Sequence, residues 1–242
     1  MWVTICFRWN RTTKKNVQPP NMKKQILLLA SIIISTLAIG QVNPSFGIRA
    51  GASSSGMRGD AINNLKNMLD FTNGMIATSD RTGFFAGGYA TFPMDNVLSL
   101  EPAIYYSQKG YEMKGELGLK GVEFLGANAK AKLNLQYIDI PVVIKANFGG
   151  LQIFGGPQFS YLINADLRTT AGLLGFNLLN KKMDASSQFN KTDIAVTGGV
   201  GYQLTHKINV MASYDYGLSK VDANKSLNSY NRSIKVGIGM SL

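Results

Sequence analysis

The feature that most constrains this chain is an alternation of apolar residues with polar or small ones, which recurs along most of its length after residue 45. In residues 137–146 (YIDIPVVIKA), every even-numbered position up to 144 holds Ile or Val, whereas Asp139 and Lys145 belong to the other set. Successive side chains of a β-strand point to opposite faces, so this alternation predicts strands. The pattern predicts eight of them, over residues 46–53, 82–92, 98–110, 137–146, 151–163, 193–204, 207–218 and 232–242.

The connections between these predicted strands alternate in length. Short connections cover residues 93–97, 147–150 and 205–207, and two of them contain the turn-forming sequences PMDN and NFGG. Long connections cover residues 54–81, 111–132, 165–191 and 219–231. An even number of antiparallel strands with tight turns at one end and long loops at the other is typical of outer-membrane barrels. The sequence therefore predicts an all-β fold, an eight-stranded antiparallel up-and-down transmembrane β-barrel with short periplasmic turns and long extracellular loops.

The charged residues inside the strands indicate which face of this barrel is polar. Burial of unpaired charges in an apolar core would cost several kcal/mol each, so the apolar face is expected to meet lipid and the polar face to line the lumen. Asp139 and Lys145 are about 20 Å apart along one strand and are expected to pair with neighbouring strands, for example with Glu101 and Arg49. The predicted lumenal polar network, a structural one, comprises Arg49, Glu101, Asp139, Lys145, Asp193, Asp215 and Lys235.

The first forty residues have the composition of a leader. Residues 22–40 begin with Met22, Lys23 and Lys24, continue with an apolar run over 26–39, and predict a signal peptide cut before Gln41. We interpret residues 1–21 as an upstream extension from a misassigned start and residues 41–242 as the barrel domain. A transmembrane anchor is the alternative for the apolar run, which is shorter than the roughly 20 residues a spanning helix needs.

Removal of the leader changes the charge and the cysteine count. The leader carries six of the 25 basic residues and no acidic one, which leaves 19 basic against 14 acidic residues. This modest excess gives no reason to expect a nucleic-acid partner. The only cysteine, Cys6, also lies in the leader, so the barrel domain has no disulfide and no cysteine ligand for a metal.

The sequence offers little that would support catalysis. The only histidine, His206, falls in a short turn, at the end of the barrel opposite the long loops. A lipid hydrolase of the serine-histidine type needs its base beside a nucleophile near the outer leaflet. No phosphate-binding loop, calcium loop or zinc spacing is present. We therefore expect a protein without catalytic activity, cofactor or metal.

Two of the long loops carry apolar patches. Residues 54–81 contain a predicted amphipathic helix with Ile62, Leu65, Met68, Leu69 and Phe71 on one face, and residues 165–191 contain the sequence AGLLGFNLL. Both patches could cap the barrel mouth or bind a protein partner, and the sequence leaves the two alternatives open. The expected partners are outer-membrane lipid and a protein bound at loops 54–81 and 165–191, and the barrel is expected to be a monomer.

Five segments also resemble a known family. The segments IYYSQKG (104–110), YIDIPVVIKA (137–146), GGPQFSYLI (155–163), GGVGYQL (198–204) and SYDYGLS (213–219) are similar to those of the PorT-like outer-membrane β-barrel proteins of Gram-negative bacteria. The resemblance covers nearly the whole chain after the leader. The resemblance implies an eight-stranded outer-membrane barrel. The founding member of the PorT-like family is associated with type IX protein secretion and gliding.

These observations lead to one expected role and three alternatives. The expected role is structural or interaction-based, in the outer membrane and accessory to protein secretion. The alternatives are a barrel that transports or binds small hydrophobic ligands, an outer-leaflet lipid enzyme, and a soluble secreted β-barrel. An apolar passage through the lumen or an opening in the wall would favour the first alternative.

Overall fold

The protein forms nine β-strands in the computed structural model, which describes residues 43–60, 63, 67, 76–119, 122–173, 176–223 and 228–242. The predicted leader lies outside the described residues. The strands are β1 (Ser45–Arg58), β2 (Ile76–Pro93), β3 (Leu98–Leu119), β4 (Val122–Phe148), β5 (Leu151–Leu173), β6 (Phe176–Asp184), β7 (Thr192–Gln203), β8 (Ile208–Gly217) and β9 (Tyr230–Ser241), with a 3₁₀ turn η1 (Ser186–Gln188). Within these ranges, no helix has both the length and the apolar character to cross a membrane.

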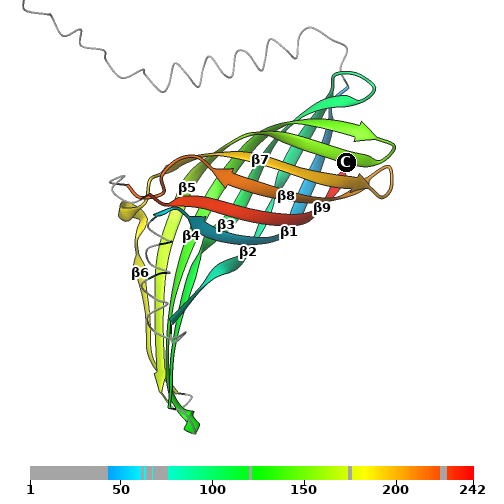
Figure 1. Ribbon diagram of the computed structural model, residues 1–242. Coiled ribbons are helices and arrows are strands. Elements are labelled where there is room, and N and C mark those ends of the chain that lie inside the picture. Colours follow the sequence, from blue (N-terminus) through cyan, green and yellow to red (C-terminus); the bar gives the residue numbers. More distant parts are fainter. Residues whose placement is uncertain are drawn as a thin grey trace, which may run out of the picture. The chain divides into compact units, whose positions relative to one another are not determined.

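Eight of the nine strands close into a barrel (Figure 1). Each strand pairs antiparallel with its neighbour in the order β1, β2, β3, β4, β5, β7, β8, β9, and β9 pairs back with β1. Strand β6 pairs only with β5 among the described residues and stands outside the ring. The predicted eight-stranded up-and-down barrel is therefore confirmed. A closed ring satisfies the backbone hydrogen bonds of every strand, which is the condition for crossing lipid as a sheet.

The long connections predicted over residues 111–132 and 165–191 consist mostly of strand, so the wall strands are longer than the sequence predicted. Strand β3 continues to Leu119 and β4 begins at Val122, so that one ladder runs from the pair Leu98 and Ala146 to the pair Leu117 and Ala127. Strand β5 likewise continues to Leu173 and turns into β6. Hydrogen bonds between neighbouring strands stabilise these extensions, although their residues alternate less regularly than those of the barrel wall.

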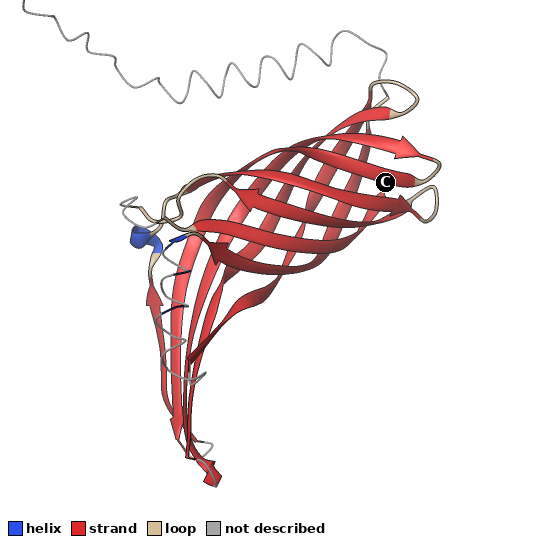
Figure 2. Ribbon diagram, in the orientation of Figure 1, coloured by secondary structure: helices blue, strands red, loops and turns tan. Residues whose placement is uncertain are grey.

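The extensions form a second structure beyond the barrel, which we call the projecting sheet. It comprises residues 76–80 of β2, 111–119 of β3, 122–136 of β4, 164–173 of β5, and β6. Figures 1 and 2 show that these strands leave the barrel at the end opposite the short turns and bend away from the barrel axis. Figure 2 shows them as strand over their described length.

The predicted loop 54–81 is also shorter than expected. Strand β1 extends to Arg58 and β2 begins at Ile76. The positions on the apolar face of the predicted helix, Ile62, Leu65, Met68, Leu69 and Phe71, lie outside the described residues. Three described positions between the two strands are helical, namely Asp60, Asn63 and Asn67.

Burial along the barrel strands follows the alternation in the sequence, with the apolar face outside. The side chains of Ile144 and Ile238 are 55% and 61% exposed, whereas the inward-pointing Asp139 has no exposed surface. In lipid this arrangement places isoleucine and valine against acyl chains and the charged residues in the lumen.

Apolar side chains close the lumen toward the projecting sheet. Met57, Leu135, Tyr137, Leu162 and Val221 pack together there with Ala165 and Ala185, and Phe189 packs against them. Phe189 follows η1 and bridges to Asp222, so the chain between β6 and β7 is held across this end of the barrel. The lumenal charges therefore lie between this apolar cluster and the short-turn end.

Candidate functional site in the barrel lumen

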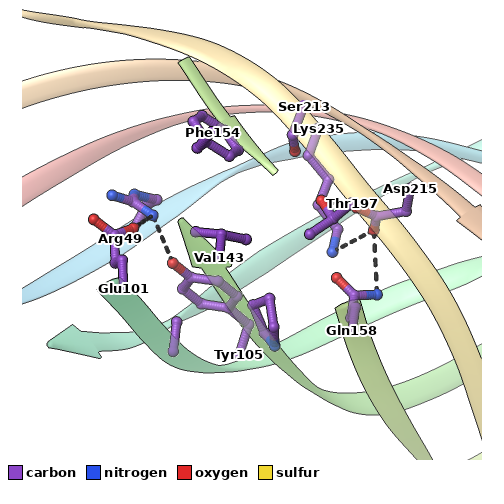
Figure 3. A pocket seen from close by; sticks show the side chains of 12 residues that line it. Arg49, Glu101, Tyr105, Val143, Phe154, Gln158, Thr197, Ser213, Asp215 and Lys235 are labelled. Atoms are coloured by element: carbon purple, nitrogen blue, oxygen red, sulfur yellow. Dashed lines mark hydrogen bonds and ion pairs between the residues drawn. The ribbon is translucent and has the colours of Figure 1, made fainter. Parts of the chain in front are cut away.

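The first group of charged side chains in the lumen surrounds Glu101, near the short-turn end. Arg49 from β1 donates from Nη1 to Glu101 Oε1 and to the Tyr105 hydroxyl, each at 2.8 Å. Lys145 from β4 donates to the second carboxylate oxygen of Glu101. The Arg49 guanidinium also stacks over the ring of Tyr89, 4.2 Å from its centroid. This Glu101 cluster links β1, β2, β3 and β4, and Figure 3 shows Arg49, Glu101 and Tyr105 together.

The second group surrounds Asp139, deeper in the lumen. Lys109 of β3 and Lys235 of β9 each donate to one oxygen of Asp139 at 2.9 Å, and Lys235 also lies 2.7 Å from Asp215 of β8. Ser107 donates to Asp139, and Thr197 and Gln158 donate to Asp215. This Asp139 cluster therefore connects strands on opposite sides of the barrel.

Asp193 belongs to neither cluster. Its carboxylate accepts hydrogen bonds from the Asn231 amide at 2.7 Å and the Ser219 hydroxyl at 2.6 Å. The structure thus places all seven residues of the predicted network in the lumen and joins six of them in two ion-pair clusters. Lys145 contacts Glu101, as expected, whereas Asp139 contacts Lys109 and Lys235 rather than Arg49 or Glu101.

Lys109 is the functional side chain that the sequence reasoning missed. It continues the alternation of Glu101, Tyr105 and Ser107 and is 3% exposed, so the parity of β3 was sufficient to find it. With Lys109 included, the charged lumenal residues named here number four basic and four acidic. Equal numbers of opposite charges allow these groups to be buried without an uncompensated charge.

The charged clusters divide the remaining space in the lumen. A cavity of about 30 Å³ lies among Arg49, Tyr105, Phe154 and Lys235 (Figure 3), and this volume is on the order of one water molecule. A larger cavity of about 340 Å³ lies at the short-turn mouth, where its lining includes Asp95, Lys145 and Asn209. The Glu101 cluster lies between the two, since Lys145 lines the outer cavity and Arg49 and Glu101 line the inner one.

The chemistry available to these cavities is limited. His206 lies in the turn between β7 and β8 and lines the mouth cavity, at the short-turn end of the barrel. In the part of the chain that the structure describes, no three side chains of His, Cys, Asp or Glu gather as metal ligands would.

Comparison with known proteins agrees with the fold. Residues 41–223 match the family model described as outer membrane protein beta-barrel domain, so this chain belongs to that family, whose place is the outer membrane. No curated protein sequence is similar enough to be matched to it.

Several solved barrels are similar in structure. Neisserial surface protein A is 15% identical with a TM-score of 0.45, and the alignment covers 83% of this chain and 99% of that one. The attachment invasion locus protein Ail of Yersinia pestis is 13% identical with a TM-score of 0.41, over 82% and 98% of the two chains. OprG of Pseudomonas aeruginosa is 12% identical with a TM-score of 0.39, over 84% and 98%.

Proposed function

We propose that this protein is a non-conducting, non-enzymatic outer-membrane barrel that holds the projecting sheet outside the membrane as a surface for binding another protein. The observation that carries this proposal is the difference between the barrel interior and the strand extensions. The barrel interior is closed by ion pairs, whereas β3, β4 and β5 extend well beyond the ring.

The closed interior argues against transport. Two ion-pair clusters and an apolar cluster follow one another along the lumen, and the cavity between the charged clusters is only about 30 Å³. An eight-stranded barrel has an interior that side chains can fill. The alternative of a hydrophobic-ligand barrel requires an apolar passage, and here the passage would have to cross charged side chains. The hydrogen-bonded ring, with β4 paired to β5 and β9 to β1, offers no lateral opening in its described strands.

The projecting sheet has features of a protein-binding surface. On one of its faces Leu179 and Met183 of β6 are 47% and 50% exposed beside Leu167 of β5. Strand β6 also has no partner on its outer edge among the described residues. Exposed apolar side chains and an open strand edge are both used to bind extended segments of other proteins.

The resemblance to PorT-like barrels suggests the process that such binding would serve. Protein secretion of the type IX kind would use a closed barrel as an accessory rather than as the conduit. This assignment rests on the resemblance, and the binding role rests on the projecting sheet.

Conductance and crosslinking test the two halves of the proposal separately. We expect the purified, folded chain to give no channel steps in a planar bilayer, and ion-selective steps would contradict closure. A photo-crosslinking residue at Leu179 should capture a defined protein partner in cells, whereas the same residue at Tyr214 in the barrel wall should not.

A shortened variant provides the matched control. The projecting sheet contains two hairpins, one of β3 with β4 and one of β5 with β6. The first can be closed by a two-residue Asn-Gly turn between the paired residues Glu112 and Lys132, and the second by the same turn between Arg168 and Lys182. The barrel should remain folded in this variant, and binding of the protein partner should be lost. Full binding of the partner without the two hairpins would overturn the binding role.

A further inference from the structure

One face of the projecting sheet carries five cations in two neighbouring cross-strand rows, together with the carboxylates of Glu112, Asp166 and Asp184. Residues that pair directly across antiparallel strands point to the same face. One cross-strand row is Glu112, Lys132, Arg168 and Lys182, and the next contains Lys114 and Lys130. We define the basic face by Lys114, Lys130, Lys132, Arg168 and Lys182.

The basic face continues the lipid-facing wall of the barrel. The ladder between β3 and β4 keeps one register from the pair Tyr105 and Asp139 to the pair Leu117 and Ala127, so even-numbered residues stay on one face. Along that face, Ile138 and Tyr106 come first, and Gln108 and Gln136 follow. The next row contains Asn134, Asp166 and Asp184, and the rows that carry the five cations lie beyond it. The six residue-to-residue steps from Tyr106 to Glu112 span about 20 Å. The face thus changes from apolar to uncharged polar and then to charged side chains, as a surface does that passes from acyl chains to headgroups.

The other face of the same sheet has a different composition. The rows between the basic ones contain Tyr111, Leu133, Leu167 and Met183, and Lys181 points to this face because it pairs with Thr169. Charged side chains of both signs therefore gather on one side of the sheet, where the carboxylates of Glu112, Asp166 and Asp184 accompany the five cations of the basic face. Leu133 and Leu167 of this other face pack against the apolar cluster that closes the lumen, so the basic face is the side left to water or to lipid headgroups.

The bend of the sheet sets the direction in which the basic face points. The strands turn away from the barrel axis as they leave the ring (Figure 1). A sheet that bends outward turns the face continuous with the outer wall toward the space beside the barrel. In a membrane that space holds the headgroups of the outer leaflet.

The charges of the basic face are only partly neutralised within the protein. Lys114, Lys130 and Lys132 all lie within 4 Å of one carboxylate, that of Glu112, at 3.7, 2.5 and 3.4 Å. Three ammonium groups around one carboxylate leave two positive charges in excess. The three lysine side chains are 50%, 43% and 39% exposed, so their charges remain accessible from outside.

We infer that the basic face binds the phosphate groups of phosphorylated glycolipids in the outer leaflet and thereby holds the projecting sheet against the membrane surface. Lysine ammonium groups are compact cations that bind phosphate without a fixed geometry, which suits a fluid layer of headgroups. Lys182 lies 3.1 Å from Asp166, but its side chain is 65% exposed and remains open to a second anion. This inference goes beyond the proposed protein-binding role and concerns the opposite face of the sheet, so either can fail without the other.

Lysine modification in nanodiscs tests the inference on the full chain. The folded protein is reconstituted in phosphatidylcholine nanodiscs with or without diphosphorylated lipid A, and acetylation by a water-soluble reagent is quantified at each lysine by mass spectrometry. We expect lipid A to slow the modification of Lys130, Lys132 and Lys182 by about threefold or more, and about 0.5 M salt to reverse the effect. Lys181 is the internal control, because it neighbours Lys182 but points to the other face.

Further nanodisc conditions and protein variants identify the ligand. Inorganic phosphate added to nanodiscs of phosphatidylcholine alone should not reproduce the protection, and lipid A without phosphates should not either. The variant Lys130→Gln/Lys132→Gln should reduce the protection of Lys182, whereas Lys181→Gln should keep it, with heat-modifiable gel mobility confirming that each variant is folded. Equal protection of Lys181 and Lys182, or no protection of either by lipid A, would overturn the inference.

Discussion

The carboxylate of Asp139 shows how individual residues hold the lumen together. It has no exposed surface and lies between the ammonium groups of Lys109 and Lys235, each 2.9 Å away. Loss of this charge leaves two buried cations with fewer acceptors. Removal of one partner from a buried ion pair generally costs more than the pair contributes as a whole.

We predict that Asp139→Asn lowers the free energy of unfolding by about 3–5 kcal/mol. Urea unfolding in lipid vesicles, followed by the gel mobility of the folded form, measures this change. Asp80→Asn is the control, because Asp80 and its partner Arg232 are 32% and 34% exposed and their ion pair should contribute less than about 1 kcal/mol. Equal effects of the two substitutions would contradict the role given to the Asp139 cluster.

Asp95 gives a pH-dependent prediction in the turn between β2 and β3. Its carboxylate accepts hydrogen bonds from the backbone N–H groups of Leu98 and Val97, both at 2.7 Å, and these bonds lower the pKa of Asp95. A carboxyl whose folded pKa is lowered stabilises the fold above its unfolded pKa, and the stabilisation is lost as pH falls through the folded pKa. An NMR titration of the Asp95 carboxyl carbon should therefore give a midpoint below about 3.9. A midpoint at or above that value would mean that the turn does not hold the carboxylate in solution.

At the scale of the strands, the contacts of two adjacent glycines differ in a way that can be measured. A Cβ at Gly87 would lie 1.9 Å from the carbonyl oxygen of Ile104 and 2.8 Å from the Tyr105 Cα, so only glycine fits at this position, where β2 pairs with β3. A Cβ at Gly88 would meet its nearest atom, the Gly47 carbonyl oxygen, at 3.6 Å, which is ordinary contact.

We predict that Gly87→Ala destabilises the barrel by about 1–3 kcal/mol, because the backbone of β3 must shift. Gly88→Ala should change stability by less than about 1 kcal/mol and serves as the matched control. The same urea unfolding experiment measures both. A tolerated Gly87→Ala would indicate that β2 and β3 are less closely apposed than the structure shows.

The strands also show where sequence reasoning succeeds and fails. It found the eight wall strands, because each has one face in lipid and one in the lumen, and this contrast produces strong alternation. It missed the extensions of β3, β4 and β5 and the whole of β6, where the contrast between the faces is weaker. It also named only Glu101 among the inward charged residues of the strand predicted over 98–110, so Lys109 was overlooked although it lies an even number of positions from Glu101.

At the scale of the whole molecule, closure of the ring is the property most open to a direct test. We predict that the expressed chain is recovered in outer membranes and migrates faster in a gel when it is not boiled, because a closed barrel resists unfolding by detergent. The shortened variant without its two hairpins should behave in the same way, since the pairing of the eight wall strands is unchanged. A soluble chain without this mobility shift would contradict the assignment of the apolar face to lipid.

Local patterns in the sequence were sufficient to predict the fold class, the number of wall strands, the end of the barrel at which the tight turns lie, and the inward position of seven charged residues, namely Arg49, Glu101, Asp139, Lys145, Asp193, Asp215 and Lys235. They were sufficient because parity along a strand and turn chemistry are local properties. The partners of Asp139 followed only from the fold, since Asp139 contacts Lys109 and Lys235 through the register of three different strands. The projecting sheet likewise depended on the fold, because its strands are stabilised by neighbours distant in sequence. The gathering of Lys114, Lys130, Lys132, Arg168 and Lys182 on one face appears only once those neighbours are aligned.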